Sequence, residues 1–192
     1  LVMYFHPDIT IRKEKYDQNG SKILVSEKST LTTIPFLKNN ELDYSEIIFW
    51  DKDSTKYSWI IFVPIVVLII ISVSNGANIT DGIDGLAAGT SAIIILTLGI
   101  FSWISGNIIF SNYLNIMYIP NLGEIVIYIC SMLGALIGFL WFNAFPAQIF
   151  MGDTGSLALG GSLGGVGIIT KHEIVLAITG GLFVLEAISV IV

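Results

Sequence analysis

Long apolar segments with almost no charged side chains limit what this chain can fold into. They cover residues 59–74, 86–104, 125–142, 157–169 and 174–192. A hydrocarbon core of about 30 Å is spanned by roughly 20 helical residues, with a range of about 17–25. We therefore predict an all-α polytopic membrane protein in which each of these segments spans, or nearly spans, a bilayer.

The charged residues are concentrated in residues 6–58. The chain of 192 residues contains 9 Lys and Arg and 15 Asp and Glu, and Lys171 is the one basic residue outside that segment. The segment has strand-like runs at 22–26 and 47–50, with turn-forming residues at 18–20. We predict that 6–58 is a polar extracytoplasmic loop that contains a small β-element.

The ends and the composition add further expectations. Residues 1–5 are predicted to be the end of a truncated transmembrane helix, so that the chain is an internal fragment in which 59–192 forms the transmembrane helical region. The formal net charge of −6 argues against nucleic-acid binding through a basic surface, and a single Cys130 cannot form an internal disulfide.

Two polar motifs, residues 75–85 and 143–156, interrupt the apolar pattern. One predicted helix leads from the polar loop to the first motif, a second leaves that face, and a third returns to it. Counting crossings therefore places both motifs on one membrane face. The same count places the stretch from Lys171 to Glu173 on the opposite face, where His172 is expected to be a loop residue rather than a ligand.

Acidic and amide side chains recur every three residues in the first motif, at Asn75, Asn78, Asp81 and Asp84. The interspersed glycines argue against a regular helix there and favour close approach of the backbone to a ligand. Each motif precedes an apolar helix, whose N-terminus suits a phosphate. Because carboxylates repel a diphosphate, a Mg²⁺ between the two would resolve the conflict. The alternative is that Asp84 and Asp153 only cap helices.

Together the motifs resemble a known family. The runs Asn75-Gly-Ala-Asn-Ile-Thr-Asp-Gly-Ile-Asp-Gly-Leu86 and Asn143-Ala-Phe-Pro-Ala-Gln-Ile-Phe-Met-Gly-Asp-Thr-Gly-Ser-Leu157 are similar to those of the polyprenyl-phosphate N-acetylhexosamine-1-phosphate transferases. The stretch from Pro146 to Asp153 favours the phospho-N-acetylmuramoyl-pentapeptide-transferase branch. The resemblance extends from about Thr30 to the end of the chain.

The resemblance implies a ten-helix fold in the bacterial inner membrane, with about five of the helices in this chain and the active site on the cytoplasmic face. It implies transfer of phospho-MurNAc-pentapeptide from UDP-MurNAc-pentapeptide to undecaprenyl phosphate, with Mg²⁺ as cofactor, release of UMP and a possible homodimer. By motif position, Asp153 matches the catalytic, metal-binding aspartate. The implied substrate-binding residues are Asn75, Asn78, Asp81, Asp84, Asn143, Phe150 and Gly152, with Phe150 placed to meet the uracil ring.

Three other functions stay open. A related transferase would use a GlcNAc-1-phosphate donor, an ion-coupled transporter would place similar broken helices near the bilayer midplane, and a non-enzymatic scaffold would not need the motif residues.

The paired aspartates and the His cluster of the family are absent here, so the chain alone is expected to be inactive. The basic residues of 6–58 would also place that loop in the cytoplasm by the positive-inside rule, against the side that a cytosolic UDP-sugar requires.

Overall fold

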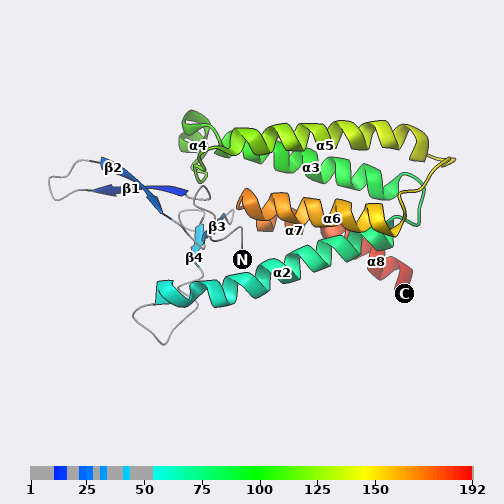
Figure 1. Ribbon diagram of the computed structural model, residues 1–192, viewed down its shortest axis with the longest axis horizontal. Coiled ribbons are helices and arrows are strands. Elements are labelled where there is room, and N and C mark those ends of the chain that lie inside the picture. The colour runs from blue at the N-terminus through cyan, green and yellow to red at the C-terminus, as the bar shows by residue number, and fades with distance from the viewer. Residues whose placement is uncertain (1–10, 17–21, 28–30, 34–40, 44–53, 192) are drawn as a thin grey trace.

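The computed structural model describes residues 11–16, 22–27, 31–33, 41–43 and 54–191. Figure 1 shows a bundle whose long helices run along the long axis of the molecule, with the strands at one end. The helices of the described part are α2 (Ser54–Thr80), α3 (Leu86–Ser105), α4 (Ile108–Leu114), α5 (Leu122–Asn143), α6 (Gly152–Ile169), α7 (Glu173–Thr179) and α8 (Gly181–Ile191). Helix α2 packs mainly on α6, and α3 packs mainly on α5.

The strands form two short antiparallel pairs. Strand β1 (Ile11–Tyr16) pairs with β2 (Lys22–Glu27), and β3 (Leu31–Thr33) pairs with β4 (Glu41–Asp43). The strand-like run predicted at 22–26 lies in β2. The predicted turn at 18–20, the run at 47–50 and the truncated helix at 1–5 lie outside the described residues.

Three helices of the described part are long and apolar enough to cross a membrane: Trp59–Thr80, Leu86–Ser105 and Leu122–Asn143. They match three of the five predicted segments and confirm a mostly helical protein with membrane-spanning segments. Large apolar side chains such as Ile93, Trp103 and Ile127 are exposed on α3 and α5, as expected of surfaces that face lipid. Helix α6 is interspersed with glycine, and Gly180 separates α7 from α8.

The first motif is more helical than predicted. Helix α2 continues through Asn75 and Asn78 to Thr80, so the expectation that glycine prevents a regular helix is wrong as far as Thr80. An ideal Cβ on Gly76 would lie 3.0 Å from Cβ of Phe183, so this glycine gives room to a ring of α8. Helix α4 was not predicted; the side chain of Asn107 caps it by accepting from Ile109 N at 2.9 Å.

Small residues bring α2 and α6 close together. An ideal Cβ on Gly160 would lie 2.6 Å from Cα of Ser74 and 2.7 Å from the carbonyl oxygen of Val73. One turn further, a Cβ on Gly164 would lie 3.3 Å from Cα of Ile70. Gly160 and Gly164, which are four residues apart on α6, therefore pack against α2, whereas a Cβ on Gly161 or Gly165 meets nothing within 4 Å.

We predict that Gly160→Ala lowers the thermal unfolding midpoint of the protein in detergent. The added methyl group meets backbone atoms of α2, so the two helices must separate; overpacking of this kind costs about 1–3 kcal/mol. The matched control is Gly161→Ala, whose methyl group enters open space in the described part. Equal midpoints for the two variants would contradict the packing described here.

At the end of the bundle near the strands, three ionisable residues are buried. They are Lys171 and His172, which lie between α6 and α7, and Glu173, which begins α7. All three lie outside the candidate spans, and their exposed fractions are 6%, 1% and 4%. The Lys171 ammonium lies 4.7 Å from the centre of the Phe62 ring, and strand β3 contacts α7. His172 thus lies in the connection between α6 and α7, as predicted, and it is buried there.

Burial sets the ionisation of this cluster. It raises the pKa of Glu173 to about 7, although Lys171 and the Thr32 hydroxyl of β3 act in the opposite direction. It lowers the pKa of His172 to about 4, against the effect of the Thr170 carbonyl. The folded protein therefore favours the neutral forms of both side chains.

We predict that Glu173→Gln changes the pH dependence of stability. Between its ordinary pKa near 4.5 and its folded pKa of about 7, Glu173 holds more proton in the folded state, so stability falls as pH rises through that window. From pH 5 to pH 8 the unchanged protein should lose this stability and the variant should not, so the thermal midpoint of the variant minus that of the unchanged protein should increase. The effect of His172 is the same in both proteins and cancels in this difference. A difference independent of pH would overturn the assignment.

Candidate functional site

The two polar motifs lie at the same end of the bundle, opposite the strands (Figure 1). Residues 81–85 connect α2 to α3, and residues 144–151 connect α5 to α6. Gly85 and Gly152 both have a φ of 71°, a left-handed conformation that glycine adopts without strain. The prediction that the motifs share one end is confirmed.

Acidic side chains of the first motif hold the backbone of the second. Asp81 Oδ2 accepts a hydrogen bond from Gly152 N at 2.9 Å, and Asp84 Oδ2 accepts one from Ala147 N at 3.0 Å. The residues preceding α3 and α6 are Gly85 and Met151, and neither helix has a side-chain cap. Asp84 therefore joins two loops instead of capping α3.

Asn143 joins the same loops from the other side. Its Oδ1 accepts from Gly85 N at 3.1 Å, and its Nδ2 donates to the Ile149 carbonyl at 2.8 Å. The side chain is 1% exposed. Asn143 thus connects the start of α3 to loop 144–151 and holds the two in a fixed relative position.

A further contact joins α2 to α6. Ser156 is fully buried, and its Oγ lies 2.6 Å from Oδ1 of Asn78. Next to it, Ser74 Oγ donates to the Leu157 carbonyl at 2.8 Å. Ser156 lies inside the second motif, but sequence reasoning did not single it out, because a serine in a glycine-rich helix gives no signal of which helix it faces.

Asp153 is exposed in the first turn of α6. Burial is the main reason why the pKa of Asp81 is raised, and the negative charge of Asp153 raises it further, while the Gly152 N–H lowers it. The two carboxylates are thus close enough to repel each other. No group of three His, Cys, Asp or Glu side chains gathers within the described ranges.

The remaining predicted residues do not join this network. Asn75 is exposed, and its Nδ2 donates to the Ile71 carbonyl of its own helix at 2.8 Å. The Phe150 side chain is 54% exposed near the end of the loop, two residues before α6 begins. The structure therefore brings together Asn78, Asp81, Asp84, Asn143 and Gly152, places Asp153 beside Asp81, and leaves Asn75 and Phe150 exposed nearby.

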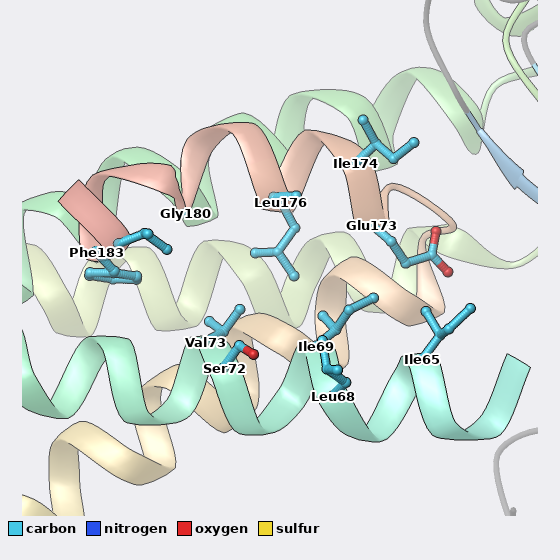
Figure 2. Close-up of a pocket in the computed structure, with 12 residues that line it drawn as sticks. Ile65, Leu68, Ile69, Ser72, Val73, Glu173, Ile174, Leu176, Gly180 and Phe183 are labelled. Atoms are coloured by element: carbon cyan, nitrogen blue, oxygen red, sulfur yellow. The ribbon is translucent and has the colours of Figure 1, made fainter. Parts of the chain in front are cut away.

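An apolar cavity lies apart from this network. It has a volume of about 330 Å³ and lies between α2 and the pair α7–α8, with Ile65, Leu68, Leu176 and Phe183 among its lining residues (Figure 2). Glu173 and Phe183 lie toward opposite ends of it. The lining suits an apolar chain rather than a nucleotide.

Comparison with known proteins agrees with the motif geometry. Residues 23–171 match the family model described as glycosyl transferase family 4. The chain belongs to this family. The family match includes both motifs and every residue of the network between them.

Curated relatives are similar over the full chain. Proteins named phospho-N-acetylmuramoyl-pentapeptide-transferase from Flavobacterium johnsoniae, Phocaeicola vulgatus and Bacteroides fragilis are 54%, 50% and 48% identical to it. Each alignment covers 100% of this chain but 49%, 47% and 47% of the relative. The chain thus spans about half the length of these relatives.

We predict that Asn143→Ala destabilises the motif end. The substitution leaves the Gly85 N–H and the Ile149 carbonyl without their side-chain partner, and the net loss for each hydrogen bond is about 0.5–1.5 kcal/mol. Cleavage by chymotrypsin after Phe150 in loop 144–151 should accelerate, and the thermal midpoint should fall. Asn112→Ala, an exposed residue of α4, is the matched control; the same behaviour in both variants would refute the role of Asn143.

Proposed function

We propose that the protein containing this chain transfers phospho-MurNAc-pentapeptide from UDP-MurNAc-pentapeptide to undecaprenyl phosphate, with release of UMP. The observation that carries the proposal is the network in which Asp81 and Asp84 hold the backbone of the second motif. It assembles carboxylates, amides and an aromatic ring from separate segments at one end of the bundle. The names of the curated relatives support this choice of donor and acceptor.

The donor site is proposed to be built around residues 75–85 and 143–153. Asn75, Asn78, Asp81 and Asp84 form one wall, and the exposed ring of Phe150 is available to stack on uracil. Gly152, with its left-handed φ and no side chain, leaves room for a nucleotide. Asn143 has its amide oxygen and nitrogen bonded within the protein, so we assign it to positioning these loops rather than to contact with substrate.

The donor set fits a Mg²⁺. Mg²⁺ is bound through one or two carboxylates together with substrate phosphates, and exposed Asp153 with nearby Asp81 offers such a pair. When bound, the ion would neutralise charge on the diphosphate. Asp153 would hold it, Asp81 would orient its water ligands while keeping α6 in place, and the first turn of α6 would add partial positive charge near the phosphate.

The position of the motifs favours an enzyme over a transporter. Helix α2 ends at Thr80 and α3 begins at Leu86, so the first motif covers the last turns of α2 and the connection to α3, at the end of a span rather than at its middle. A transporter site would lie near the midplane, with broken helices around it. We propose that this end faces the cytoplasm of a bacterial inner membrane, where UDP-sugars are found, and that the segment 6–58 lies outside.

We predict that Asp153→Asn in the full-length protein slows UMP release by about 10²–10³-fold. Loss of one preorganised charge contact to a transferred phosphoryl group costs about 10²–10³ in rate. The matched control is Glu124→Gln, since Glu124 is also an exposed acid in the first turn of a helix but belongs to α5, whose first turn lies at the opposite end of the bundle. The assay contains undecaprenyl phosphate, Mg²⁺ and either UDP-MurNAc-pentapeptide or UDP-GlcNAc.

Each outcome of that assay has a meaning. Release of UMP only with the MurNAc donor supports the proposal, and release only with UDP-GlcNAc supports the related transferase. Normal turnover by Asp153→Asn would overturn the role of this carboxylate. An inactive unchanged protein would refute the function itself.

A further inference from the structure

The buried hydroxyl of Ser156 determines how an amide of the candidate site is oriented. Ser156 lies in the second turn of α6, is 0% exposed, and is assigned no role by the motif comparison. Its Oγ lies 2.6 Å from Asn78 Oδ1, 3.0 Å from the Gly152 carbonyl oxygen and 3.3 Å from the Asp153 carbonyl oxygen. A hydroxyl has one proton, so one of these oxygens is its principal acceptor.

The distances identify that acceptor. A separation of 2.6 Å is ordinary for O–H···O, whereas N–H···O bonds are about 2.7–3.2 Å long. The atom of Asn78 that faces Ser156 is therefore the oxygen, and Ser156 donates to it. The two carbonyl oxygens of α6 are more distant and take a weaker share of the same proton.

This bond fixes where the nitrogen of Asn78 points. With Oδ1 held by Ser156, Nδ2 occupies the other position of the amide, and the described part of the chain gives it no hydrogen-bond partner. Asn78 is half-buried and lies three residues before Asp81, so the two side chains are neighbours at the end of α2. An amide NH₂ at this place offers two donors beside a row of acceptors.

We propose that Ser156 is a positioning residue that holds the Asn78 amide with its NH₂ toward an acceptor oxygen of the nucleotide donor. The proposal rests on the proposed function, because the oxygen belongs to that substrate. Asn78 makes the contact, and Ser156 acts through it. Without the serine hydroxyl, the side-chain amide of Asn78 can rotate by about half a turn. Its own oxygen then faces the substrate oxygen, and the two oxygens repel each other.

The test is a double-mutant cycle in the full-length protein with saturating undecaprenyl phosphate. Ser156→Ala should raise KM for the UDP-linked donor by roughly 3- to 10-fold, with kcat nearly unchanged, because a contact present in both ground and transition state is weakened. Asn78→Ala should raise KM at least as much. In the Asn78→Ala background, Ser156→Ala should have no further effect on KM.

The matched control is Ser162→Ala. Ser162 lies on the same helix, but its hydroxyl bonds to the Ala158 carbonyl of α6 at 2.8 Å and not to α2. Its KM should equal that of the unchanged protein. If Ser156→Ala does not fold, Ser156→Cys replaces it, since a thiol fills nearly the same space and donates weakly.

The outcomes separate the two proposals. No UMP release by the unchanged protein refutes the proposed function. If the unchanged protein releases UMP normally, two results refute the positioning role and leave the function intact. The first is that the effects of Ser156→Ala and Asn78→Ala on KM multiply in the double variant. The second is that the Ser156 and Ser162 variants have equal KM values.

Discussion

The hydrogen bonds that Asp81, Asp84 and Asn143 accept from backbone N–H groups of the opposite motif are the interactions on which the candidate site depends. Residues 81–85 and 144–151 leave N–H and C=O groups outside any helix, and such groups are costly when buried without partners. The polar side chains of each motif supply those partners. The same residues that mark the site in the sequence therefore also determine its shape, and a substitution in one motif is felt in the other.

That network requires α2 and α6 to lie close together. Gly160 allows the approach because even a methyl group there would meet the backbone of α2. The close approach places Ser74 beside Leu157 and Asn78 beside Ser156. The packing of α2 on α6 thus sets the positions of the amide of Asn78 and the hydroxyl of Ser156. Gly160 contributes to the site in this way although it has no functional group of its own.

Much of this arrangement was predictable from the sequence. Apolar length identified three spans, and counting crossings placed both motifs at one end, since a helix that crosses the membrane must reverse the side of the chain. Helix α4 and the interruption at Gly180 were not predicted. The extension of α2 to Thr80 was also missed, because Gly76 packs against Phe183 of α8 and no local pattern reveals that tertiary contact. The partners of Asn143 and Ser156 were equally hidden, since no periodicity tells which of two loops an amide will bond.

The two ends of the bundle accommodate charge differently. Near the strands, Lys171 and Glu173 are buried together, so the charge of each opposes the pKa shift that burial causes in the other. The motif end holds Asp81, Asp84 and Asp153, and no Lys, Arg or His occurs between Lys56 and Lys171. Backbone N–H groups compensate Asp81 and Asp84 only in part, and Asp153 stands in the first turn of α6 beside Asp81. No basic side chain between those two lysines therefore balances these carboxylates, and the Mg²⁺ proposed above would meet a site whose negative charge that stretch does not neutralise.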